Sequence, residues 1–239
     1  EPRKSTRRSS KSGRPVEPEP ELQLQLLTTI RKPVTTFWAR PYTTDAKAVK
    51  EVVENNCYEH TRLGSREDGY RKFKLGDCEV WLDLGGNVGA FSKWCLLKGA
   101  RRVVSYEPEP NNFRILEKNL QEMNCEAHME AVGPGSGTGS APLYLCNTEY
   151  NKYRHSLHKR THKTSVAVPV VGVETVLERH PECTGVKIDI EGAEIAILEQ
   201  TVWPEQITHL VFEYTFDVDP SLDRFHRIMD NLRKRFKIV

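Results

Sequence analysis

The chain has 239 residues, of which 38% are hydrophobic and 28% charged, and its formal net charge is +2. This length suits one compact domain with a tail, and the near balance of charge indicates no particular class of partner. No apolar run approaches the roughly 18–20 residues that a membrane-spanning helix needs, so we expect no membrane span.

The first 20 residues are polar and contain Pro, Gly and Ser, and six of the first 15 are Lys or Arg. Such a segment buries too little apolar surface to offset the entropy of ordering it, which predicts a disordered tail over residues 1–20. A solvated linker, a remnant of an organellar targeting segment and a nucleic-acid-binding arm all remain open. Because the chain does not begin with Met, we expect it to be part of a longer precursor.

The cysteines are scattered and form no C-x-x-C pair, which argues against a zinc ribbon or a disulfide framework. Reduced thiols are therefore expected, and they favour a cytoplasmic or organelle-interior compartment. The six positions are Cys57, Cys78, Cys95, Cys125, Cys146 and Cys183.

Residues 21–74 are expected to form an N-terminal arm and a cover helix. Residues 20–40 alternate apolar and polar side chains, as in a peripheral strand. Residues 45–56 place four apolar side chains at helical spacing, with Thr44 or Asp45 as the expected N-cap.

From residue 75 to residue 239, short apolar strands alternate with helices. Strands are expected over residues 79–84, 102–106, 127–132, 186–190 and 209–214. Helices are expected up to about residue 98, up to residue 120, and over 193–200 and 222–234. This alternation predicts an α/β fold with a doubly wound, mostly parallel sheet. Residues 236–239 predict a strand just begun, so the last edge strand of the domain is expected to be missing.

The turn after the first strand reads Asp-x-Gly-x-Asn-x-Gly, formed by Asp83, Gly85, Asn87 and Gly89, with Gly86 inside it. Neither reading frame fits the G-x-G-x-x-G fingerprint of dinucleotide binding. An acid before the turn would repel a pyrophosphate, but it suits a cofactor with a cationic amino group. The glycines still let the backbone approach that ligand closely.

Glu107 ends the second strand, about twenty residues past the glycine turn. A carboxylate there can accept hydrogen bonds from both hydroxyls of a ribose. The alternative is that Glu107 only caps a helix or pairs with a Lys. A nucleoside that lacks phosphates and carries a charged amino acid is S-adenosylmethionine, which becomes the expected cofactor.

The chain resembles the FkbM-type family of class I methyltransferases over roughly residues 75–216. The combination of EPEPNN with KIDIEGAE is the most specific part of the resemblance, since many methyltransferases share the first motif. The matching stretches are Gly76-Asp77, WLDLGGNVGAFS, YEPEPNNFRILEKNL, EAVG, VETVLE, VKIDIEGAEIAILE and LVFEY. The resemblance implies a Rossmann-like methyltransferase fold that uses S-adenosylmethionine.

The resemblance also assigns roles along the cofactor. It implies that Asp83, Gly85, Asn87 and Gly89 hold the methionine end and that Glu107 holds the ribose. Glu130 stands where such enzymes commonly contact adenine. Gly86 replaces the Ala that is usual within the turn.

Four ionisable residues near the ends of the last two strands are expected to carry the chemistry. The sulfonium already activates the methyl group, so the acceptor has to be aligned and a hydroxyl acceptor deprotonated. Asp189 or Glu191 is expected to do this, with Lys187 on the same strand face as Asp189 and Glu213 near the acceptor. Alternatively, Glu191 only caps the helix that follows Gly192.

Two groups of side chains in the sequence could bind a metal ion. Asp189, Glu191 and Glu213 could converge on a divalent ion. His155, His158 and His162 could share a helix face and bind zinc, although their basic surroundings are also typical of a solvated loop.

Residues 146–164 are interpreted as an insertion specific to this chain. Its position between the third and fourth strands predicts a lid over the acceptor pocket. Its basic composition could also steer an anionic acceptor.

The favoured function is O-methylation of a small or sugar-like hydroxyl acceptor. No N-P-P-Y tetrapeptide, typical of amine-directed enzymes, follows the fourth strand. A methyltransferase directed at RNA or an amine remains an alternative, with nucleic acid possible as a partner but not favoured. A non-catalytic methyltransferase-fold subunit of a larger assembly is the other alternative.

Overall fold

The computed structural model describes residues 23–59, 74–146, 155–159 and 164–237. The expected tail over residues 1–20 lies outside these ranges. Within them, no helix combines the length and the apolar character needed to cross a bilayer.

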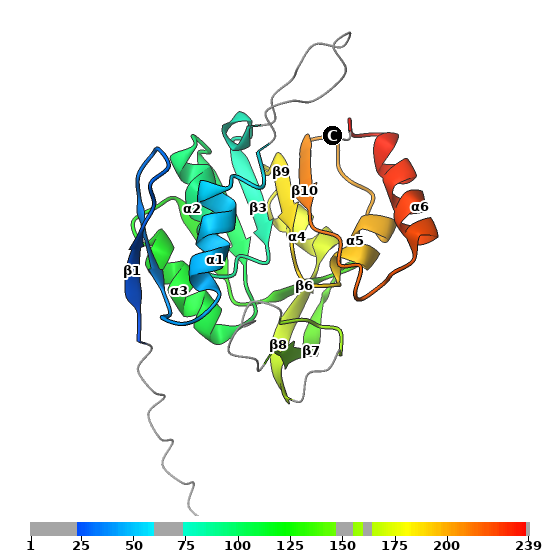
Figure 1. Cartoon of the computed structure of the whole chain (residues 1–239). Coiled ribbons are helices and arrows are strands. Elements are labelled where there is room, and N and C mark those ends of the chain that lie inside the picture. The colour runs from blue at the N-terminus through cyan, green and yellow to red at the C-terminus, as the bar shows by residue number, and fades with distance from the viewer. Residues whose placement is uncertain (1–22, 60–73, 147–154, 160–163, 238–239) are drawn as a thin grey trace, which may run out of the picture.

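Five parallel strands form the central sheet, in the spatial order β10-β9-β3-β4-β5 (Figure 1). Their bounds are β3 Val80–Leu84, β4 Arg102–Tyr106, β5 Cys125–His128, β9 Gly185–Ile188 and β10 His209–Phe212. Along the chain, β4 and β5 follow on one side of β3, and the next strands of this sheet, β9 and β10, lie on the other side of β3. The expected doubly wound sheet is confirmed, and its topological switch point lies between β3 and β9.

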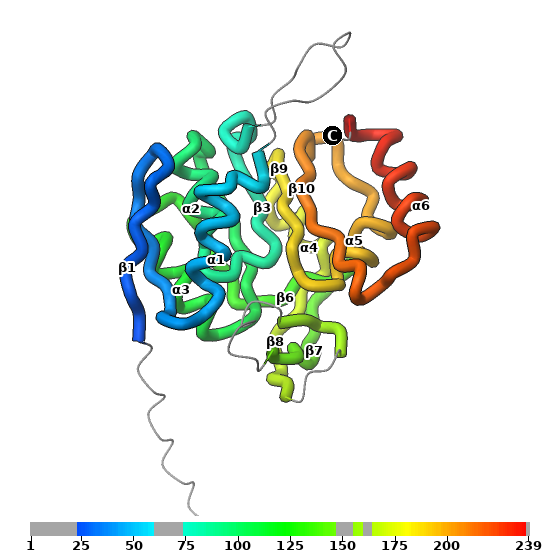
Figure 2. The backbone as a smooth tube through the Cα atoms, viewed as in Figure 1, coloured from blue at the N-terminus to red at the C-terminus, as the bar shows by residue number. Residues whose placement is uncertain are grey.

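The sheet is buried on both faces, as strand alternation in β3 shows. Val80, Leu82 and Leu84 belong to one hydrophobic core, whereas Trp81 belongs to a second core on the opposite face. Figure 2 shows the helices of the first half of the chain on one side of the sheet, and α5 and α6 on the other. The helices are α2 Ala90–Leu97, α3 Pro110–Leu120, α4 Val173–Arg179, α5 Glu194–Gln200 and α6 Leu222–Arg233.

A second, three-stranded sheet lies beyond the carboxyl ends of the central strands (Figure 1). It has the order β6-β8-β7, with bounds β6 Ala131–Gly133, β7 Thr138–Leu145 and β8 Thr164–Gly172. The prediction of one strand over 127–132 was wrong, because β5 ends at His128 and β6 pairs with β8 in the other sheet. The antiparallel pair β7–β8 was not predicted, and it flanks the expected insertion.

The N-terminal arm is an antiparallel pair, β1 (Gln25–Thr28) and β2 (Thr36–Ala39), followed by α1 (Asp45–Val49). The helix continues as a π-helix over Lys50–Glu54, and a 3-10 turn, Leu75–Asp77, leads into β3. Thr44 occupies the N-cap position of α1, but its side chain makes no capping hydrogen bond. Phe236 and Lys237 are not in a strand, and the remainder of the expected last strand lies outside the described residues.

One buried side chain ties the arm to the main domain. Asn119 of α3 accepts from the backbone N–H of Trp38 (2.6 Å) and donates to the carbonyls of Trp38 (2.9 Å) and Val88 (2.8 Å). The side-chain amide of Asn119 thus makes the hydrogen bonds with Trp38 of β2 that a neighbouring strand would otherwise make. It also holds the turn before α2. Its fractional exposure is 2%, so water cannot take over these hydrogen bonds.

Replacing Asn119 with Ala should lower the free energy of unfolding by about 2–4 kcal/mol, because buried groups at Trp38 and Val88 lose their partners. Urea denaturation measures the change. Glu117→Ala, at an exposed position of the same helix, is the control and should change stability by no more than about 0.5 kcal/mol. Equal midpoints for the two variants would contradict the role given to Asn119.

Candidate functional site

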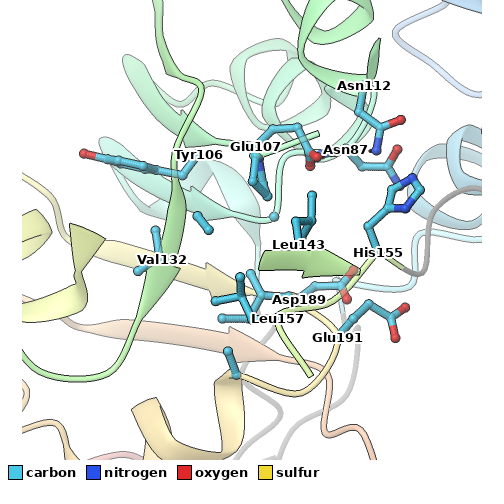
Figure 3. A pocket seen from close by; sticks show the side chains of 15 residues that line it. Asn87, Tyr106, Glu107, Asn112, Val132, Leu143, His155, Leu157, Asp189 and Glu191 are labelled. Atoms are coloured by element: carbon cyan, nitrogen blue, oxygen red, sulfur yellow. Dashed lines mark hydrogen bonds between the residues drawn. The ribbon is translucent and has the colours of Figure 1, made fainter. Parts of the chain in front are cut away.

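A pocket opens at the carboxyl ends of β3, β4 and β9, where the small sheet faces the central one. It encloses about 630 Å³ of empty space, part of which is open to solvent. In Figure 3, Glu107 and Asn87 lie on one side of the pocket, and Asp189 and Glu191 lie on the other. The lining residues are Gly85, Asn87, Tyr106, Glu107, Pro108, Asn112, Ala131, Val132, Leu143, His155, Leu157, Asp189, Ile190, Glu191 and Ala193.

The glycine turn brings the ends of β3 and β9 into backbone contact. Gly85 has φ +89°, and a Cβ on it would lie 1.8 Å from the carbonyl oxygen of Asp189. The N–H groups of Gly85 and Gly86 both donate to the carbonyl of Tyr106 at 3.0 Å, which ties the turn to β4. Only a residue without a side chain fits at position 85.

Only two of the expected turn residues line the pocket, namely Gly85 and Asn87. Gly86 instead lies against Ser105 and Leu116, and Gly89 stands at the N-cap of α2 with φ +80°. The side-chain Oδ1 of Asn87 is buried and has no hydrogen-bond partner among the described residues, an arrangement that suits a donor on a bound ligand.

Glu107 is held by hydrogen bonds to both of its carboxylate oxygens. Oε2 accepts from the N–H of Asn87 (2.7 Å), and Oε1 accepts from the N–H of Glu109 (2.9 Å) and the amide of Asn112 (3.4 Å). Burial raises the pKa of Glu107 to about 7, while the N–H donors act in the opposite direction. The carboxyl therefore changes its charge near neutral pH, at the wall of the pocket.

Asp83 does not line the pocket, which differs from the role expected for it. Its side chain is fully buried, with Oδ2 accepting from the Ser92 hydroxyl (2.6 Å) and Oδ1 3.2 Å from Nζ of Lys187. Lys187 is 3% exposed and also donates to the carbonyl of Gly85 (2.7 Å). The charge of Asp83 is therefore balanced inside the protein by Lys187. Its expected contact with the methionine end of the cofactor stays a prediction.

The expected acids at the ends of β9 and β10 do come together. Oδ2 of Asp189 lies 3.7 Å from Nζ of Lys187, and the hydroxyl of Tyr58 donates to Oδ2 of Asp189 (3.4 Å) and to Oε1 of Glu213 (2.9 Å). Only Asp189 of these residues lines the pocket. Tyr58 was missed from the sequence because it lies in the arm, before every recognisable motif.

Glu191 lies on a strained turn at the rim of the pocket, with φ +57°. The helix that follows begins at Glu194, with Ala193 at the N-cap, so Glu191 does not cap it. Glu194 is the structural acid here, since its fully buried carboxylate accepts from the N–H groups of Gly192 (2.5 Å) and Thr215 (2.9 Å).

The segment between β7 and β8 covers part of the pocket. Leu143, His155 and Leu157 line it, and the Ser156 hydroxyl donates to the carbonyl of Glu191 at 2.5 Å. Residues 155–159 thus lie over the pocket, as expected for a lid. The rest of the predicted lid, including His162, lies outside the described residues.

Glu130, the expected adenine contact, is not among the lining residues, whereas its neighbours Ala131 and Val132 are. The carboxylate of Glu130 pairs instead with Arg179 at 3.3 Å. The contact of Glu130 with adenine, which the resemblance implies, stays a prediction.

Neither expected metal site is assembled in the described residues. There, the one group of three ligand-type side chains close enough to share an ion is Glu126, His128 and His180. Glu126 already forms an ion pair with Arg102, so the guanidinium of Arg102 balances its charge.

Comparison with known proteins connects this geometry to a family. The model of the methyltransferase FkbM domain matches residues 83–237, well over half of the chain. No curated protein sequence matches the chain.

Two solved structures are similar to parts of the chain. One is a methyltransferase FkbM from Methylobacillus flagellatus, with 17% identity and a TM-score of 0.41 over 80% of this chain and 49% of that one. The other is a proposed RNA methyltransferase from Pyrococcus horikoshii, with 26% identity and a TM-score of 0.22 over 26% of this chain and 40% of that one. The chain therefore spans half or less of either protein.

The family match includes the pocket residues at the ends of β3, β4 and β9, and methyltransferases of this family use S-adenosylmethionine. The chain belongs to the FkbM family of methyltransferases.

Proposed function

We propose that this chain binds S-adenosylmethionine in the pocket and transfers its methyl group to a hydroxyl of a small or sugar-like acceptor. The observation that carries the proposal is the joining of Glu107, Asn87 and Asp189 in one pocket at the switch point of the sheet. A non-catalytic subunit would have no physical need for such a set of groups.

The pocket residues fit the cofactor. The carboxylate of Glu107 is the acceptor for the ribose hydroxyls, and the unpartnered Oδ1 of Asn87 is an acceptor for the amino group of the methionine end. Gly85 leaves room for close approach to the backbone, and Ala131 and Val132 offer an apolar surface to the adenine. When bound, S-adenosylmethionine supplies a methyl group already activated by its sulfonium.

The acceptor half of the pocket is acidic. Asp189 and Glu191 line it. The hydroxyl of Tyr58 contacts the carboxylates of both Asp189 and Glu213 and so links the two. A carboxylate there can orient a hydroxyl and take its proton as the new bond forms. This favours a neutral hydroxyl acceptor over an anionic one such as RNA, which the carboxylates would repel.

Binding of S-adenosylmethionine should weaken as the pH falls through about 7, because Glu107 becomes protonated and can no longer accept both ribose hydroxyls. The affinity should fall about tenfold between pH 8 and pH 6, the change expected for one proton at a pKa of about 7. Isothermal titration calorimetry of the whole chain measures it.

Glu107→Gln should weaken binding at pH 8 by at least about tenfold and remove this component of the pH dependence. The control is Glu117→Gln, at an exposed position of α3 that does not line the pocket, and its affinity should stay within about twofold of that of the unaltered chain. Unchanged affinity and pH dependence in Glu107→Gln would rule out the proposed ribose contact. If the unaltered chain binds neither S-adenosylmethionine nor its demethylated product, the non-catalytic alternative takes its place.

Asp189→Asn should leave the affinity for S-adenosylmethionine within about threefold but reduce methyl transfer by about 100-fold or more, because the amide cannot take a proton. The measurement is transfer of labelled methyl groups to a panel of hydroxyl compounds, with calorimetry of the same preparations. Glu199→Gln, at an exposed site in α5, is the control. Full activity of Asp189→Asn would move the base function to Glu191.

A further inference from the structure

We infer that Tyr58 is a positioning residue of this site: its hydroxyl holds the carboxylates of Asp189 and Glu213 in their working arrangement. Tyr58 lies outside residues 83–237, which match the family. The inference rests on the proposed methyl transfer for its purpose, although the contact itself can be tested separately.

The Tyr58 side chain is fixed by packing. The residue is 8% exposed, and its ring meets the ring of Phe91 edge-on, with centroids 5.2 Å apart and planes at 87°. Phe91 packs in the same manner against Trp81, which is fully buried. The ring position is therefore set by the core, so the hydroxyl is presented in one place.

The hydroxyl lies between two groups that repel each other. It donates to Oε1 of Glu213 at 2.9 Å and reaches Oδ2 of Asp189 at 3.4 Å, so Glu213 receives the stronger hydrogen bond. Asp189 has a second partner in Lys187, whose Nζ is 3.7 Å away. The shared donor allows both carboxylates to stay close to each other despite their like charge.

The charges around the hydroxyl keep its proton in place. Burial, followed by the charges of Asp189 and Glu213, raises the pKa of Tyr58 well above its usual value, so it remains a donor. The pKa of Glu213 is raised, mainly by the charge of Asp189 and further by that of Glu51. The hydrogen bond from Tyr58 and the charge of Lys187 act in the opposite direction. Cys57 also faces this group, and burial raises its pKa to about 11, so it stays neutral.

This arrangement makes the N-terminal segment part of the site. Tyr58 follows the π-helix Lys50–Glu54, which packs against α2 through the core that contains Val52, Val53 and Phe91. Residues 21–74, expected from the sequence to form only an arm and a cover helix, therefore supply a functional side chain.

The test is Tyr58→Phe, which keeps the ring against Phe91 and removes only the hydroxyl. Carbon-13 NMR of the Glu213 carboxyl, followed over pH, should show its titration midpoint moving upward by about half a pH unit or more, because the charged form loses a hydrogen bond. Tyr214→Phe is the matched control: Tyr214 adjoins Glu213 in sequence, its hydroxyl has no hydrogen-bond partner, and its removal should leave the midpoint unchanged.

Methyl transfer gives a second measurement. Tyr58→Phe should lower kcat by about tenfold and shift its pH profile in the direction of the Glu213 midpoint, with the affinity for S-adenosylmethionine unchanged. An unmoved midpoint overturns the inference, as does an unchanged kcat and pH profile in an active enzyme. If the unaltered chain shows no methyl transfer, the proposed function fails, while the NMR comparison still decides whether Tyr58 holds the Glu213 carboxylate.

Discussion

The ammonium group of Lys187 lies where β3 and β9 meet, in contact with the carboxylates of Asp83 and Asp189 and the carbonyl of Gly85. Burial alone would lower the pKa of Lys187, but these carboxylates raise it, so the group stays charged. A buried charge is tolerated only with partners, and these come from both sides of the switch point. One cation thereby fixes the glycine turn relative to the acidic turn, and the two halves of the pocket keep their spacing because of it.

The other segments that line the pocket are held near Lys187 by separate hydrogen bonds. The Tyr106 carbonyl holds the glycine turn, the Asn87 N–H holds Glu107, and the Ser156 hydroxyl holds the backbone of Glu191. The arm reaches the centre through Tyr58. Segments distant in the sequence thus meet at the ends of three adjacent strands, where a parallel sheet leaves backbone groups and side chains available for ligands.

The central sheet was predictable because its strands carry strong local signals. β3 is apolar except for Asp83 and is followed by two glycines. β9 is a short buried strand that contains Lys187, and Asp189 follows it directly. Asn112 also lies in a recognisable motif. The ion pairs of Asp83 with Lys187 and of Glu130 with Arg179 were not predictable, because the partners are distant in sequence. Tyr58 carries no local signal at all, since only tertiary packing brings it to Glu213. The division between β5 and β6 depends on which sheet each strand joins, which apolar pattern alone does not reveal.

The contact between Gly85 and the carbonyl of Asp189 also limits how such a site can diversify. With only 1.8 Å between that oxygen and the place of a Cβ, no side chain can be introduced at position 85 without displacing the turn after β9. A change in the turn after β9 that altered acceptor specificity would therefore also disturb the glycine turn, where the cofactor is proposed to bind. The described part of the β7–β8 connection, residues 155–159, meets this region through side chains, among them Leu157 in the pocket and Ser156 at the carbonyl of Glu191. In proteins with this arrangement, acceptor specificity should accordingly vary with the β7–β8 connection. The turns after β3 and β9 should stay unchanged.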